Sequence, residues 1–88
     1  MYLHLGSSVV IRQRDVVGIF DLDNTTSPRI TRDFLTQAQR AGRVVTVGDD
    51  LPKSFLLCRD GAGETTVYLS QLSSATLLKR MESGGFTV

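Results

Sequence analysis

The sequence is poor in residues that cross-link or anchor small proteins. It holds one cysteine, Cys58, and one histidine, His4, among 88 residues. One cysteine excludes a disulfide within the chain, and with a single histidine it cannot complete a zinc cluster. The apolar runs are far too short to span a bilayer, and no basic segment or cleavage site of an export signal follows Met1. We therefore expect a cytoplasmic protein with no membrane partner, no metal and no cofactor.

The chain also lacks an excess of charge of either sign, since its basic and acidic residues nearly cancel to a formal net charge of +1. The basic residues are nevertheless unusual in kind, with eight arginines against two lysines. Arginine is favoured where planar contacts to phosphate or carboxylate are needed, although a lineage bias in composition explains the same ratio. A hydrophobic content of 41% fits one globular domain over residues 1–88, with 84–88 as a flexible tail. So short a chain has a thin core, which favours oligomerisation.

The order of apolar runs and turn residues predicts a small α+β domain. We expect β-strands at 2–5 (resuming at 9–11), 14–22, 44–47, 54–58 and 65–70. Ser27 as cap and Pro28 at the first helical position predict a helix that runs to Ala41 and ends at Gly42. A short C-terminal helix begins at Ser73 or Ser74. The order is β-β-α-β-β-β-α, and hairpin-type connections after the first helix favour a largely antiparallel sheet with the helices against it.

The long helix has two contrasting sides. At helical spacing, one side is apolar and should face the core, with Leu35 at its edge; it carries Ile30, Phe34, Ala38 and Ala41. The opposite side carries Arg29, Arg32, Thr36 and Arg40. Such a row of arginines is either a surface for phosphates or an ordinary solvated face.

One stretch imitates the first motif of the haloacid-dehalogenase phosphohydrolases. An apolar run at 16–20 leads to Asp21 and Asp23, which that resemblance would make nucleophile and general acid, with Mg²⁺ between them. Asp49 and Asp50 imitate the second acidic pair, and Lys53 the phosphate-binding lysine. That chemistry needs a doubly wound parallel sheet, and each parallel connection takes a dozen residues or more. The chain has room for only one such connection, so we expect no catalytic residue and rank the phosphohydrolase last.

Taken together, the segments resemble the RemA/RemB-like extracellular matrix regulators of Gram-positive bacteria, and the RemB branch more closely. The resemblance runs from Tyr2 to about Arg80. It is carried by YLHLG at 2–6, RDVVGIFD at 14–21, SP at 27–28, PKS at 52–54 and YLSQLSSATLLKR at 68–80. It implies a transcriptional regulator of biofilm matrix genes that forms a ring-like homo-oligomer and contacts double-stranded DNA through arginines. The resemblance matches Arg14 to a DNA-binding arginine, places Arg32 in the corresponding helix and matches Lys53 to a basic position after the turn. With Arg29 and Arg40 from the same helix face, the expected DNA-contacting set is Arg14, Arg29, Arg32, Arg40 and Lys53.

The chain departs from the RemA pattern at one place. RemA-type proteins have adjacent arginines after the glycine of the third-strand turn, whereas here Asp49 and Asp50 follow Gly48. Two carboxylates there would repel a phosphate backbone, so the DNA surface is expected to differ from that of RemA. The alternative is a non-enzymatic oligomeric interaction module, one that co-assembles with a RemA-type subunit.

Overall fold

The computed structural model describes residues 1–22 and 28–84. Its elements, in chain order, are β1 (Tyr2–Gly6), β2 (Val9–Arg12), the 3-10 helix η1 (Gln13–Asp15), β3 (Val16–Asp21), α1 (Pro28–Arg40), β4 (Val44–Thr46), β5 (Ser54–Arg59), β6 (Thr65–Ser70) and α2 (Ser74–Gly84). The predicted cap Ser27 and Asp23 of the phosphohydrolase motif lie outside the described residues, as does the chain beyond Gly84.

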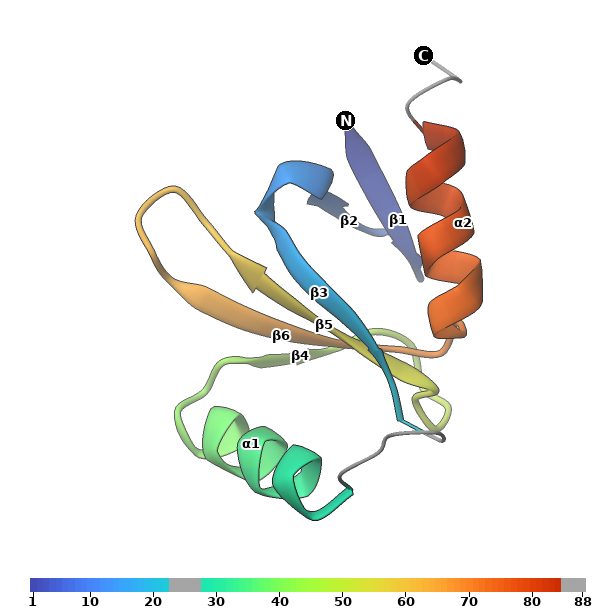
Figure 1. Cartoon of the computed structure of the whole chain (residues 1–88). Coiled ribbons are helices and arrows are strands. Elements are labelled where there is room, and N and C mark those ends of the chain that lie inside the picture. The colour runs from blue at the N-terminus through green and yellow to red at the C-terminus, as the bar shows by residue number, and fades with distance from the viewer. Residues whose placement is uncertain (23–27, 85–88) are drawn as a thin grey trace.

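A four-stranded sheet in the order β3-β5-β6-β4 forms the middle layer. Its β3–β5 and β5–β6 pairs are antiparallel, and β4 joins β6 in parallel. Helix α1 crosses one face of this sheet, while the β1–β2 hairpin and α2 lie on the other (Figure 1). The predicted α+β class and the largely antiparallel sheet are confirmed, with β4 as the parallel exception.

The first strand of the prediction is in fact two. The break at residues 6–8 reverses the chain, so that β1 and β2 pair as an antiparallel two-stranded sheet. Gly6, Ser7 and Ser8 have φ values of 103°, 46° and 68°, the left-handed region that tight hairpin turns require. The observed order therefore has three strands before α1, one more than predicted.

The main core lies between the hairpin, α2 and the sheet. Its buried members are Leu3, Leu5, Ile11, Val47, Leu56, Cys58 and Leu77. On β1 the buried residues alternate with exposed ones, and His4 is one of the exposed residues. Helix α2 begins where the Ser73 hydroxyl accepts a hydrogen bond from the Thr76 N–H at 3.1 Å, the predicted cap.

Helix α1 lies outside that core, and this corrects the prediction for its apolar side. Ile30 is 69% exposed and Phe34 39% exposed, while the side chains that turn towards the sheet and are half-buried are Thr31, Leu35 and Ala38. Phe34 approaches the ring of Phe55 on the sheet, with 6.3 Å between the ring centroids. The apolar stripe of the helix is therefore wider than the surface that covers it.

Candidate nucleic-acid interface

Local sequence fixes both ends of α1 and so the direction of its arginines. Pro28 occupies the first helical position, where no N–H is needed. At the other end Gly42 has φ 72°, its N–H donates to the Gln39 carbonyl, and the N–H of Arg43 donates to the Ala38 carbonyl, both at 3.0 Å. This Schellman arrangement satisfies the last carbonyls and ends the helix at the predicted glycine.

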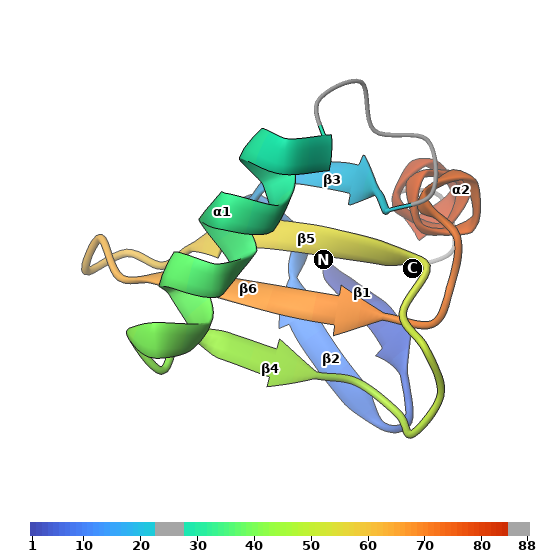
Figure 2. The ribbon, with the colours of Figure 1, turned by 90° about the horizontal axis from the view of Figure 1, so that it is seen from below.

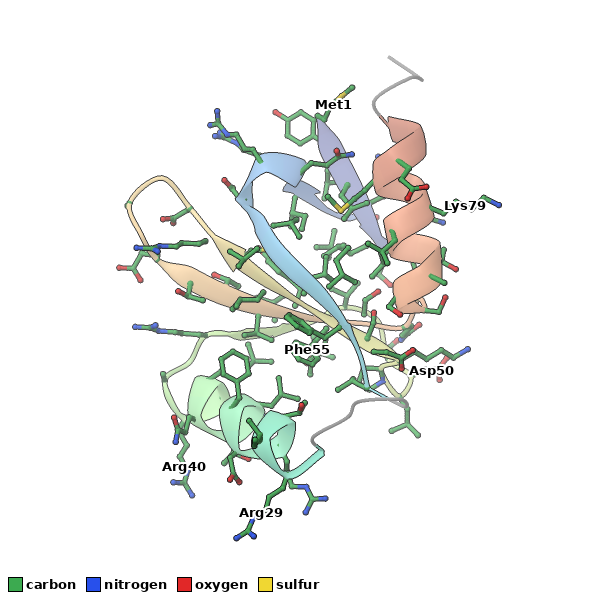
Figure 3. All side chains as sticks on the ribbon, in the orientation of Figure 1. Met1, Arg29, Arg40, Asp50, Phe55 and Lys79 are labelled. Carbon is green, nitrogen blue, oxygen red and sulfur yellow. The ribbon has the colours of Figure 1, made fainter. Side chains whose placement is uncertain are left out.

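The side of α1 that turns away from the sheet carries the arginine face, defined here as Arg29, Arg32 and Arg40. All three side chains are exposed. Figure 3 shows Arg29 and Arg40 pointing outward from the helix, away from Phe55 and the sheet. Asp33, also exposed, is the acidic residue that the helix places among them. The surface carries a net positive charge on one rigid element, as an electrostatic contact with phosphates requires.

Arg14 lies in η1, at the hairpin end of the molecule, and α1 lies at the opposite end (Figure 1). At the hairpin end, Arg14 lines a shallow hollow together with Met1, Tyr2 and Arg12. Gln13 holds this corner, since its backbone N–H donates to the Met1 carbonyl at 3.0 Å. Sequence reasoning missed Arg12, although the period-two pattern of β2 signals its exposed side.

Lys53 follows the β4–β5 connection, in which residues 48–52 form the acidic loop. Gln71 clamps this loop: its side-chain oxygen accepts from the N–H groups of Asp49 and Asp50 at 2.7 and 2.6 Å. Both aspartates are exposed, and Leu51 is 87% exposed. The loop thus exposes two carboxylates and one leucine side chain, while the hydrogen bonds to Gln71 hold its backbone in place. The acidic pair was predicted, but the clamp and the exposed leucine were not.

The five predicted contact residues therefore occupy three places within one chain. The arginine face gathers three of them, while Arg14 and Lys53 each stand elsewhere. A single protomer offers no continuous strip through all five. Copies of the chain would have to bring them together around an assembly.

The residues of the phosphohydrolase motif are not arranged for that reaction. Asp21 ends β3, whereas Asp49 follows β4, and these strands form opposite edges of the sheet. Three strand spacings, roughly 14 Å, separate these two strands. Among the described residues, no three metal-ligating side chains gather where they could hold an ion. The Asp21 carboxylate instead accepts a long hydrogen bond of 3.4 Å from the Ser74 hydroxyl at the start of α2.

The cysteine is a core residue rather than a nucleophile. Cys58 is 5% exposed, and its burial, with a smaller contribution from the Asp15 carboxylate, raises the pKa of the thiol to about 11. Burial also raises the pKa of the Tyr68 phenol, assisted by Cys58 and Asp15. A thiol with so high a pKa is protonated at neutral pH and reacts slowly.

Two further surveys cover residues 1–22 and 28–84. Within them no three or more metal-ligating side chains gather into a cluster that could hold an ion. No helix in the same ranges is long and apolar enough to cross a membrane.

Comparison with known proteins gives one informative relative. No family model matches the chain. The chain is 39% identical over 82 residues to the extracellular matrix regulatory protein B of Bacillus subtilis (strain 168), an alignment that covers 93% of this chain and 91% of the relative. The relative is named as a regulatory protein.

Proposed function

Because the chain belongs to the family of extracellular matrix regulatory protein B, we propose that it is a non-enzymatic, DNA-associated regulator of the transcription of biofilm matrix genes. It works in the cytoplasm as a ring-like homo-oligomer. The regulatory part of this proposal is supported by the name of the relative. The contact with DNA comes from the residues of this chain.

The arginine face is the observation that carries DNA binding. Three guanidinium groups stand on the exposed side of one capped helix, and guanidinium is the group best matched to phosphate oxygens. Three contacts from one protomer bind weakly. An oligomer that repeats them along a duplex multiplies the affinity without any new kind of contact. Arg14 and Lys53 join the contact surface through neighbouring copies.

The test is DNA binding by gel shift and fluorescence anisotropy over a series of salt concentrations. The variant Arg29→Ala/Arg40→Ala is expected to lower affinity about tenfold or more and to flatten the dependence of log K on log salt by about 1.8 for each subunit on DNA. The matched control is Lys79→Glu, which lowers the net charge equally from an exposed position on α2. No shift by the wild type at low salt and high protein concentration contradicts the proposal, as does equal loss in the control.

The acidic loop favours a second candidate, a protein-interaction module that co-assembles with a RemA-type subunit. Its carboxylates repel phosphate but attract a basic protein surface. This candidate predicts an oligomer that fails to shift DNA alone and that forms a mixed assembly, seen by native mass spectrometry, with the RemA-type protein. A homo-oligomer that binds DNA and excludes the second protein contradicts it.

A further inference from the structure

An apolar trough runs between α1 and the sheet and is left open in the single chain. Two adjoining hollows that share Phe34 compose it, and its walls are Phe20, Ile30, Phe34, Phe55, Leu57 and Val67. Phe20 is 44% exposed and stacks on Phe55 with the ring centroids 4.8 Å apart. With Ile30 and Phe34 also exposed, this is a contiguous apolar surface of the kind that marks an interaction site.

The trough has a basic end. Arg43, placed there by the Schellman turn, lines the trough beside Thr65. Arg59 pairs with Thr65 in the β5–β6 ladder, and alternation along β5 puts its side chain on the same face as Leu57. A suitable occupant therefore has an apolar side chain for the floor and negative charge for this end.

The acidic loop has those properties in that combination. Leu51 is the most exposed large apolar side chain among the described residues, and Asp49 and Asp50 precede it directly. Because Gln71 holds the loop backbone, little conformational entropy is lost when the loop is bound. Within one chain the loop leaves the sheet at the end opposite to the β5–β6 turn, so it lies far from the basic end of its own trough (Figure 2).

We infer that the acidic loop of one copy docks in the trough of the next, with Leu51 on the aromatic floor and the aspartates against Arg43 and Arg59. The two surfaces differ, so the contact is heterologous, and repetition produces a closed ring or an open chain. This inference rests on the homo-oligomer of the proposed function and supplies its interface. It uses none of the residues of the arginine face.

The experiment measures the mass of the full chain by sedimentation velocity at a fixed concentration. The wild type is expected at several times 9.6 kDa. Leu51→Asp is expected to fall to the monomer mass, because a carboxylate is driven out of an apolar trough. The matched control is Leu78→Asp, a leucine of α2 that is 49% exposed and lies outside the trough; it should assemble like the wild type. A monomeric wild type, or an assembled Leu51→Asp, overturns the inference.

A mixing experiment tests the head-to-tail geometry. Ile30→Asp disables the trough and leaves the loop intact, and Leu51→Asp does the reverse. Mixed in equal amounts they retain one good interface and should form dimers but nothing larger, while each alone stays monomeric. Both side chains are more than two-thirds exposed, at 69% and 87%, so neither change removes core packing, and circular dichroism of each variant checks the fold. Failure to form the mixed dimer overturns the inference.

DNA binding is recorded on the same samples, which separates this inference from the proposed function. A wild type that assembles through Leu51 but never shifts DNA refutes the proposed function and leaves the interface standing. A wild type that shifts DNA while Leu51→Asp keeps its full mass refutes the interface alone.

Discussion

Gly48 lies directly against the side-chain amide group of Gln71, so close that a Cβ on the glycine would overlap that amide group. Gly48 also has φ 86°, in the left-handed region. Both the limited space and the positive φ exclude a side chain at this residue. The glutamine can bind both aspartate N–H groups only because nothing projects from the preceding residue. The shape of the acidic loop therefore depends on a residue that has no side chain.

Gly48→Ala is expected to destabilise the protein by about 2 kcal/mol or more, because it adds an overlap to a strained φ. Two other glycines separate these causes. Gly42 has φ 72° but open space around it, and Gly61 has neither constraint. Urea unfolding should show a loss of about 1 kcal/mol for Gly42→Ala and under about 0.5 kcal/mol for Gly61→Ala. Equal losses in all three variants would contradict this account.

How far the sequence predicts the molecule depends on whether local rules decide each feature. Helix α1 ends at Gly42 as predicted, because a left-handed residue there is a local requirement. The outward arginines were also predictable from helical spacing. The exposure of Ile30 was not, since it depends on how much of the stripe the sheet covers. Residue spacing within one helix carries no information about how much of its stripe the neighbouring elements cover.

The same contrast applies to the first hairpin. The turn residues at 6–8 were visible, but whether a strand resumes or reverses after them depends on tertiary contacts. One of these contacts is buried: the Ser70 hydroxyl donates to the Leu5 carbonyl at 3.1 Å and accepts from the Leu72 N–H at 3.1 Å. It ties β1 to the end of β6, 65 residues away. No pattern within either strand indicates such a pairing.

Ser70→Ala removes both of those hydrogen bonds from a fully buried position, and we expect it to cost about 1–3 kcal/mol. Thr36→Ala, on the exposed side of α1, loses a hydroxyl of similar size and should change stability by under about 0.5 kcal/mol. Chemical denaturation measures both. Hydrogen exchange should also show faster opening of β1 in the Ser70 variant, and unchanged protection there would contradict the link between hairpin and sheet.

The charge at the basic end of the trough gives a rescue experiment. Arg43→Asp alone and Asp50→Arg alone each place like charges across the inferred contact. Each is expected to weaken assembly about two- to fivefold per interface, the scale of an exposed ion pair. The chain that carries both changes restores an opposite pair and should assemble nearly as the wild type does. Sedimentation over a series of concentrations measures this.

Arg12→Asp is the control for the charge exchange, since it reverses an exposed arginine of β2 outside the trough. It should leave assembly unchanged. A double variant that assembles no better than either single variant would show that Arg43 and Asp50 do not face each other.

The last prediction concerns pH. The native state raises the pKa of the Cys58 thiol from 9.0 to about 11, chiefly by burial, and raises that of Tyr68 in the same direction. Both groups are neutral when protonated, so the native state binds these protons more tightly than the unfolded state does. For the Cys58 thiol, this contribution to stability is complete below pH 9 and is lost as the pH rises through 11. The raised pKa of Tyr68 acts in the same direction. For the thiol the loss is on the order of 2 kcal/mol.

Urea unfolding at pH 8 and pH 10.5 should show this decline, and Cys58→Val should remove the part due to the thiol. Alkylation offers a second measurement on the wild type. At pH 8 the native thiol should react with iodoacetamide about a hundredfold more slowly than the same thiol in urea, because a pKa two units higher leaves that much less thiolate. Equal rates in the folded and unfolded protein would show that Cys58 is accessible and ionised, and that the core does not close over β5 as the structure has it.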